Sequence, residues 1–266
     1  MASERLLEAE IAGMRVAYRR VGQGPSLVLL HGALSDSRDW RPQLGELADQ
    51  FTLIAWDAPG SGQSSDPPET FGMDDWADCL AGLLDQLQVD RAHVLGLSWG
   101  GVLALELYRR YPERARSLVL ADTYAGWRGS LGEKACRQRV EAVLRQVDLS
   151  PSEVVEEWMP TLLAPGASVE LREELTGIMS EYHPAAMRPM VRSMDSDYGD
   201  LLPKVAVPTL LLWGEADQRS PLSVAEELRD AIPSAELVVI PGAGHMSNLE
   251  RPEHFNAEVR RFCASL

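Results

Sequence analysis

The sequence is poor in cysteine, in basic side chains and in long apolar runs, and each shortage excludes a class of protein. Cys79, Cys136 and Cys263 are the only cysteines, and their spacing gives neither a disulfide framework nor a metal-binding motif. Lysine and arginine total 25 against 40 aspartates and glutamates, and the net charge of −15 would repel nucleic acid and anionic membranes. No apolar run reaches the roughly 20 residues that span a bilayer.

The N-terminal segment MASERLLEAEIAG also lacks the apolar stretch of a signal peptide. We therefore expect a cytoplasmic protein with reduced thiols, acting on a small molecule without nucleic acid or membrane partners. A homo-oligomer is compatible with this composition.

Apolar residues make up 45% of the chain, enough for a sizeable core. Short apolar runs alternate with helix-length segments, after a stretch at 10–21 that suggests an antiparallel hairpin. The runs predicted to form strands are 26–30, 51–57, 92–98, 117–122, 209–217 and 235–245. Strands separated by helices predict a parallel sheet with right-handed crossovers.

The alternation stops between about residues 123 and 200, where helix signals replace strand patterns. Ser150 to Glu153 forms a capping box with Pro151 at the first helical position. We therefore predict a core built from 1–122 and 201–266, interrupted by a helical lid at 123–200. An insertion at this point would lie above the carboxyl ends of the strands, where ligands bind in such folds.

The sequence Gly96-Leu97-Ser98-Trp99-Gly100 places a serine in a G-x-S-x-G pattern. The pattern follows a predicted strand and precedes a predicted helix, which is the context that an exposed nucleophile requires. Glycines two residues on either side would leave room for a strained turn that presents the serine hydroxyl. Ser98 is therefore the candidate nucleophile.

A serine hydroxyl needs a base, and the sequence offers five histidines. His245 directly follows the last predicted strand, so it should lie at the same sheet edge as Ser98. His31 also ends a strand, but its glycine neighbour suggests a role in shaping a loop. We interpret His93 as a core residue and His254 as solvated, whereas His183 lies in the lid. His245 is therefore the candidate base.

The base in turn needs an acid that holds its tautomer. Asp217 ends the strand before His245, and the order serine, aspartate, histidine is the one expected on this architecture. Asp122, which ends the strand after the nucleophile helix, is the alternative acid. We predict that the backbone amides of Ala33 and Trp99 stabilise the oxyanion that develops during acyl transfer.

Five segments carry a resemblance to a known family. They are LLHGALSDS (29–37), DAPGSGQS (57–64), GLSWGG (96–101), LLWGEAD (211–217) and GAGHMSNLERPE (242–253). In order and spacing they resemble the α/β-hydrolase superfamily. The resemblance implies a mostly parallel eight-stranded sheet with helices on both faces and a helical lid. It does not identify the substrate, because this fold hosts many chemistries.

Within that superfamily, a serine at position 98 argues against the dehalogenase and epoxide hydrolase branches, whose nucleophile is an aspartate. Leu97 and the sequence HGALS weaken the resemblance to C–C bond hydrolases. We expect hydrolysis of a carboxylic ester or lactone through an acyl-enzyme, without metal or organic cofactor. An amidase, a C–C hydrolase or a perhydrolase on the same triad, and a ligand receptor built on this fold, stay open as alternatives.

The lid residues Trp127, Trp158, Met187 and Met190 are predicted to bind substrate. Methionines recur at helical spacing in the last lid segment, and methionine suits an adaptable pocket wall. The same side chains would equally serve to dock the lid on the core. The first lid helix is also locally basic, at Arg128, Lys134, Arg137, Arg139 and Arg145. This pattern indicates either a solvated face or recruitment of a carboxylate-bearing substrate.

Overall fold

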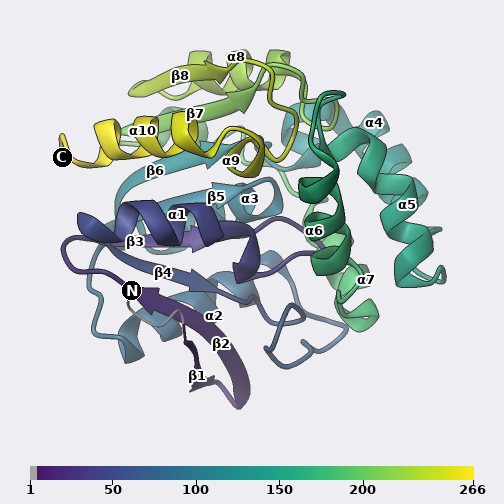
Figure 1. Ribbon diagram of the computed structural model, residues 1–266, viewed down its shortest axis with the longest axis horizontal. Coiled ribbons are helices and arrows are strands. Elements are labelled where there is room, and N and C mark those ends of the chain that lie inside the picture. Colours follow the sequence, from purple (N-terminus) through teal and green to yellow (C-terminus); the bar gives the residue numbers. More distant parts are fainter. Residues whose placement is uncertain (1–4) are drawn as a thin grey trace.

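A computed structural model describes residues 5–266 and shows an eight-stranded sheet with helices on both faces (Figure 1). The strands are β1 (Leu6–Ile11), β2 (Met14–Val21), β3 (Ser26–Leu30), β4 (Thr52–Trp56), β5 (Ala92–Leu97), β6 (Ala115–Ala121), β7 (Thr209–Gly214) and β8 (Ala235–Ile240). Their order across the sheet is β1-β2-β4-β3-β5-β6-β7-β8. Of the seven pairings between these strands, β1–β2 and β2–β4 are antiparallel and the other five are parallel.

The inner parallel strands are almost entirely buried, as expected for parallel strands covered on both faces. All six residues of β5 and all six of β7 are buried. The opening hairpin turns at Ala12 and Gly13, and its first strand begins at Leu6, earlier than the sequence pattern suggested.

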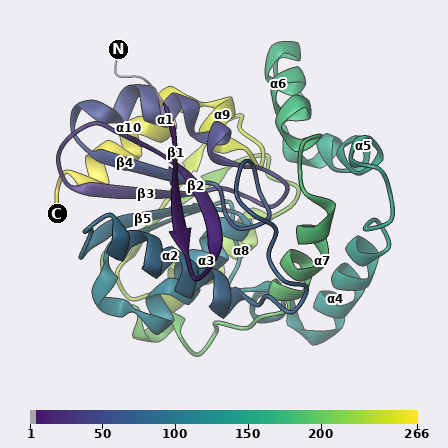
Figure 2. The same ribbon diagram turned by 90° about the horizontal axis from the view of Figure 1, so that it is seen from below.

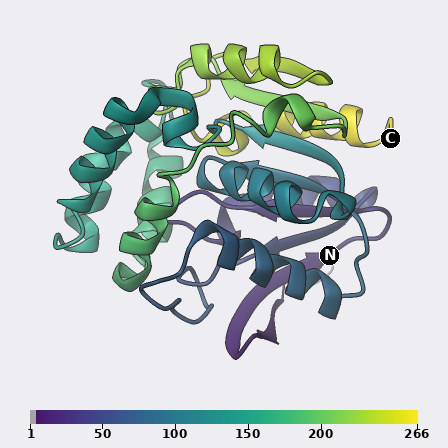
Figure 3. The same ribbon diagram turned by 180° about the vertical axis from the view of Figure 1, so that it is seen from behind.

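Two layers of helices sandwich the sheet (Figure 2). One layer holds α1 (Arg41–Glu46), α9 (Ser247–Glu250) and α10 (Pro252–Cys263), and the other holds α2 (Met73–Gln86), α3 (Trp99–Arg110) and α8 (Leu222–Ala231). Figure 3 shows α2 and α3 side by side across the back of the sheet. Short 3-10 helices complete the connections at Ser37–Trp40, Leu47–Asp49, Pro112–Arg114 and Leu202–Lys204.

Four further helices lie between β6 and β7, and residues 122–208, all of them described, contain no strand. These are α4 (Trp127–Leu144), α5 (Pro151–Leu162), α6 (Val169–Met179) and α7 (Pro184–Ser193). They form a group beyond the carboxyl ends of the parallel strands (Figure 1). The capping box is present at α5, where the Ser150 amide donates to the Glu153 carboxylate at 2.8 Å.

The predicted fold class is confirmed, including the helical insertion. The division of the chain at residues 122/123 and 200/201 into core and lid stays a prediction. No helix in residues 5–266 is long and apolar enough to cross a membrane. All three cysteines are buried free thiols.

Candidate active site

The backbone turns sharply at Ser98, between β5 and α3. Ser98 has φ 53° and ψ −116°, a conformation that costs free energy for a residue with a side chain. Its amide donates to the Ala121 carbonyl of β6 at 2.9 Å, which fixes the turn against the sheet. A Cβ added at Gly96 would lie 2.2 Å from the Gly100 carbonyl oxygen, and one at Gly100 would lie 2.2 Å from that of Leu30. Only glycines allow this close packing of the turn.

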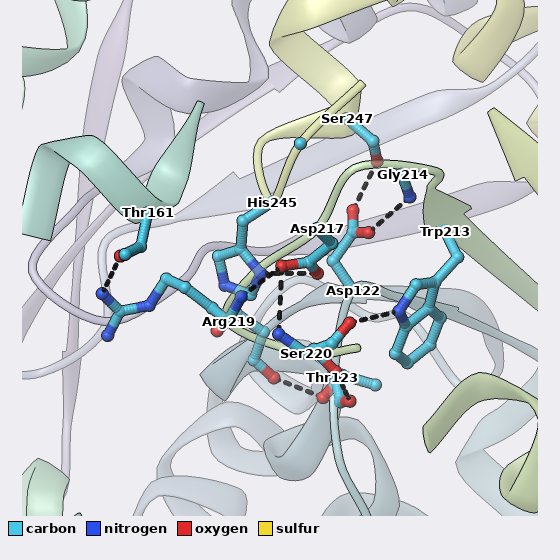
Figure 4. A network of polar contacts seen from close by, with 12 residues as sticks. Asp122, Thr123, Thr161, Trp213, Gly214, Asp217, Arg219, Ser220, His245 and Ser247 are labelled. Atoms are coloured by element: carbon cyan, nitrogen blue, oxygen red, sulfur yellow. Dashed lines mark hydrogen bonds and ion pairs between the residues drawn. The ribbon is translucent and has the colours of Figure 1, made fainter. Parts of the chain in front are cut away.

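His245 and Asp217 form a buried pair at the carboxyl ends of β7 and β8. Nδ1 of His245 lies 2.9 Å from Oδ2 of Asp217, and both side chains are almost fully buried. The other carboxylate oxygen accepts hydrogen bonds from the amides of Arg219 and Ser220, at 2.8 and 3.0 Å (Figure 4). With its acceptor positions occupied in this way, Asp217 holds the histidine ring in one orientation and favours the tautomer that leaves Nε2 unprotonated.

Asp122, the alternative acid, has different partners. Its carboxyl group accepts hydrogen bonds from the Gly214 amide, at 2.8 Å, and from the Ser247 hydroxyl (Figure 4). Burial, together with the nearby charge of Asp217, raises the pKa of Asp122 well above its usual value. These contacts join the end of β6 to the end of β7 and to the start of α9, two residues after His245.

Ala33 and Trp99, which carry the candidate oxyanion amides, line the same cavity as Ser98 and His245. Ala33 follows β3, and Trp99 is the first residue of α3, where backbone N–H groups have no acceptor within the helix. The His31 ring shapes the first of these loops: Nδ1 lies 2.7 Å from the Gly32 carbonyl, and Nε2 accepts from the Ala58 amide at 3.0 Å. Burial lowers the pKa of His31, consistent with a neutral imidazole that donates through one nitrogen and accepts through the other.

The remaining histidines lie elsewhere. His93 is buried in β5 with Nδ1 2.7 Å from the Ser117 hydroxyl, as expected of a core residue. His183 precedes α7, with Nδ1 2.6 Å from the Asp66 carboxylate.

The loop that carries His245 is fastened to the end of α5. The Leu162 carbonyl accepts the His245 amide at 2.9 Å. The buried carboxylate of Glu250 accepts the amides of Ala164 and Gly244, each at 2.8 Å. Sequence reasoning missed Glu250, because a glutamate directly before an arginine-proline pair reads as an ordinary surface residue. This acid fixes the candidate base and the insertion relative to one another.

Helices α4, α5 and α7 supply much of the cavity wall. The four residues predicted to bind substrate all line the cavity and are buried: Trp127, Trp158, Met187 and Met190. Most of the other lining side chains are apolar as well, including Leu34, Leu97, Leu162, Leu175, Met179, Val191, Met194 and Met246. An apolar cavity that contains a few polar groups is typical of a site for a small organic molecule.

One lining residue carries an unpaired carboxyl group that the sequence did not reveal. Asp39 is fully buried, and neither of its side-chain oxygens has a hydrogen bond of good geometry among the described residues, although the Ser35 hydroxyl lies beside it. Burial raises its pKa to about 7. Asp39 lies in a polar segment, SDSRD, which reads as an exposed loop, so nothing in the local sequence marks this carboxyl group as buried.

The part of the chain that the structure describes contains no group of three or more histidine, cysteine, aspartate or glutamate side chains placed to hold a metal ion.

Comparison with known proteins assigns the chain to a family. The model of the alpha/beta hydrolase family matches residues 27–258. The chain belongs to this family. Because the match spans most of the chain, it includes the segments that carry Ser98, Asp217 and His245 and confirms the resemblance drawn from the sequence.

Individual relatives of this hydrolase have different activities. A thermophilic esterase from Thermogutta terrifontis is 30% identical, with a TM-score of 0.90 and 98% of each chain covered. A hydrolase from Pseudomonas aeruginosa PA01 is also 30% identical, with a TM-score of 0.88 and coverage of 98% of this chain and 99% of the other. A proline iminopeptidase from Lactobacillus helveticus is 29% identical over 92% of both chains. Membership of the family therefore establishes that the protein is a hydrolase. It does not establish which type of bond the protein cleaves.

Proposed function

We propose that this hydrolase cleaves a carboxylic ester or lactone of a small molecule through an acyl-enzyme at Ser98. The observation that carries the proposal is the meeting of three features in one apolar cavity. These are the strained serine turn, the His245–Asp217 pair and the amide-bearing loops at Ala33 and Trp99. The similarity to the esterase from Thermogutta terrifontis, with nearly full coverage, supports ester hydrolysis.

In the proposed reaction, Nε2 of His245 accepts the proton of the Ser98 hydroxyl as Oγ attacks the acyl carbon. The amides of Ala33 and Trp99 donate to the oxyanion of the tetrahedral intermediate. His245 then gives its proton to the departing alkoxide, and the acyl group stays on Ser98. A water molecule, deprotonated by His245, attacks the acyl carbon. The bond between the acyl carbon and the Ser98 oxygen then breaks, His245 returns the proton to that oxygen, and the carboxylic acid is released.

A fluorophosphonate probe tests the nucleophile directly. We expect labelling at Ser98 in the wild-type enzyme and none in Ser98→Ala, which should melt at nearly the same temperature because the turn depends on glycines and not on the hydroxyl. Labelling at another residue, or full activity of the alanine variant, would contradict the proposal.

A substrate panel then tests the bond type. The panel contains p-nitrophenyl esters, lactones and aminoacyl amides, each measured with wild type and Ser98→Ala. Fast multiple turnover of esters or lactones supports the proposal. Turnover confined to amides would assign the triad to C–N hydrolysis, and a single burst without turnover would favour a ligand receptor.

A further inference from the structure

Two arginine side chains border the cavity that holds Ser98 and His245. Arg139 comes from α4, and Arg219 comes from the loop after β7, two residues beyond Asp217. The two lie 80 residues apart in sequence but are in contact, since Nη2 of Arg139 donates to the Arg219 carbonyl at 3.2 Å. Two cationic groups therefore share one wall of a mostly apolar site.

The Arg219 side chain reaches from the Asp217 loop to α5 (Figure 4). Its Nη1 donates to the Thr161 hydroxyl at 3.1 Å, and its guanidinium carbon lies 4.1 Å from the centre of the Trp158 ring. Among the described residues, no carboxylate oxygen lies within 4.0 Å of this guanidinium. Burial and the charge of Arg139 lower its pKa to about 10, so it stays protonated at neutral pH.

Arg139 is held in a similar way. Its guanidinium stacks on two rings, 4.8 Å from the centre of Trp127 and 5.1 Å from that of Tyr124, and Nη1 donates to the Tyr124 hydroxyl at 2.8 Å. It also forms no ion pair with any residue of 5–266. Aromatic faces and neutral oxygens thus hold both arginines in place while leaving N–H donors of each unused.

Other arginines of α4 provide a contrast. Arg128 pairs with Asp195 at 2.7 Å and Arg137 pairs with Glu133 at 2.7 Å, both at the exposed surface. In a chain with a net charge of −15, carboxylates are abundant. Neither arginine of the cavity, however, forms an ion pair with a carboxylate of the described residues. Two like charges on one wall of a mostly apolar cavity repel one another, and an anion bound near both would relieve that cost.

We propose that Arg139 and Arg219 form a subsite for a substrate carboxylate, so that the enzyme prefers esters or lactones that carry a second, free carboxylate. This inference rests on the proposed ester hydrolysis and specifies its substrate class. A guanidinium donates two parallel hydrogen bonds to a carboxylate, and the aromatic rings beneath both arginines limit their motion, which makes the pair a preorganised anion site.

The test compares substrates that differ only in charge. The first pair has the charge on the acyl side: the p-nitrophenyl monoester of adipic acid and p-nitrophenyl 6-methylheptanoate, in which two methyl groups replace the carboxylate oxygens. The second pair has it on the alcohol side: 4-acetoxybenzoate and 4-isopropylphenyl acetate. Spontaneous hydrolysis is subtracted, and kcat and KM are measured for wild type, Arg219→Gln, Arg139→Gln and the control Arg137→Gln.

We expect wild type to prefer the anionic member of at least one pair, through a lower KM. Arg219→Gln and Arg139→Gln should each reduce that preference by roughly tenfold or more, whereas Arg137→Gln should leave it unchanged. Arg219→Gln keeps the backbone amide of residue 219, which donates a hydrogen bond to the Asp217 carboxylate. Rising salt should raise the KM of the anionic ester and not that of its neutral partner.

Equal kcat/KM losses for both members of each pair, or no wild-type preference in either pair, would overturn the carboxylate subsite. Ser98 labelling and turnover of neutral esters would survive that outcome. Failure of the proposed hydrolysis would instead abolish both, so the two results are distinguishable.

Discussion

The carboxylate of Asp217 lies 2.9 Å from Nδ1 of His245, whereas the carboxyl group of Asp122, at the end of the neighbouring strand, is bound to Gly214 and Ser247. The two acids end adjacent parallel strands and both are buried. Their hydrogen-bond partners differ. Asp217 orients the His245 ring, whereas Asp122 connects segments that follow neighbouring strands.

This division predicts different effects of the same substitution. Asp217→Asn should lower kcat/KM by roughly ten-thousandfold, because an amide favours the wrong histidine tautomer. Asp122→Asn should lower it less than about tenfold, since the raised pKa of Asp122 makes a neutral amide a close substitute. Steady-state kinetics on one ester measures both. The reverse order of losses would make Asp122 the catalytic acid.

The serine turn should tolerate no side chain at position 100. Gly100→Ala places a Cβ 2.2 Å from the Leu30 carbonyl oxygen and should destabilise the fold by roughly 3 kcal/mol or prevent folding. Gly177→Ala is the matched control: the glycine is exposed within α6 and its Cβ would have no neighbour within 4 Å. The control should gain about 0.5 to 1 kcal/mol in urea unfolding. Similar results for the two variants would contradict the packing argument.

The buried carboxyl group of Asp39 should make stability depend on pH. Its pKa is raised from 3.8 to about 7 in the folded protein, so between these values the unfolded chain loses a proton that the folded protein keeps. Stability should therefore fall as pH rises through this window, by up to about 1.4 kcal/mol per pH unit from this group. The side chain of Asp39→Asn does not titrate. The free energy of unfolding of this variant, taken relative to that of wild type, should therefore be higher at pH 8 than at pH 5.

Urea unfolding at several pH values measures this difference. Asp90→Asn, at an exposed position, is the control and should show no such gain with pH. A constant difference between wild type and Asp39→Asn across the window would show that the carboxyl group is solvated or paired.

Methionines of the insertion should influence acyl-chain preference. Met190 lines the cavity, whereas Met159, equally buried in the insertion, is not among its lining residues. Met190→Ala should change the ratio of kcat/KM between short and long p-nitrophenyl esters by roughly tenfold, because the space beside the substrate grows. Met159→Ala should lower Tm to a similar extent, from a similar loss of buried volume, without changing the ratio.

Met190 is a clearer choice than Trp158, whose Nε1 also donates to Gln146 at 2.8 Å and so links α5 to the end of α4. If Met190→Ala lowers activity on all chain lengths equally and in step with Tm, this residue acts only in packing.

The sequence alone determined the features that depend on short segments. Apolar runs bounded by turns predicted the parallel strands, and G-x-S-x-G between a strand and a helix predicted the turn at Ser98. Strand ends also indicated which polar residues should gather, because the carboxyl ends of parallel strands meet at one edge of the sheet. For this reason the sequence alone predicts the candidate site residues Ser98, Asp217, His245, Ala33 and Trp99.

Only the tertiary structure decided which of these side chains touch and which further residues join them. Asp122 and Asp217 both follow buried strands, and the contact of Asp217 with His245 depends on how two loops 28 residues apart pack together. Arg139 shares a basic helix with Arg128 and Arg137, yet it alone of the three meets the cavity, through contacts with the Arg219 carbonyl 80 residues away. The burial of Asp39 and the support that Glu250 gives to Ala164 are likewise products of long-range packing.

The physical reason is the range of each interaction. The local sequence pattern determines which face of a helix or strand is apolar. The partner of each polar group depends instead on how whole elements are placed relative to one another, and no short segment encodes that placement.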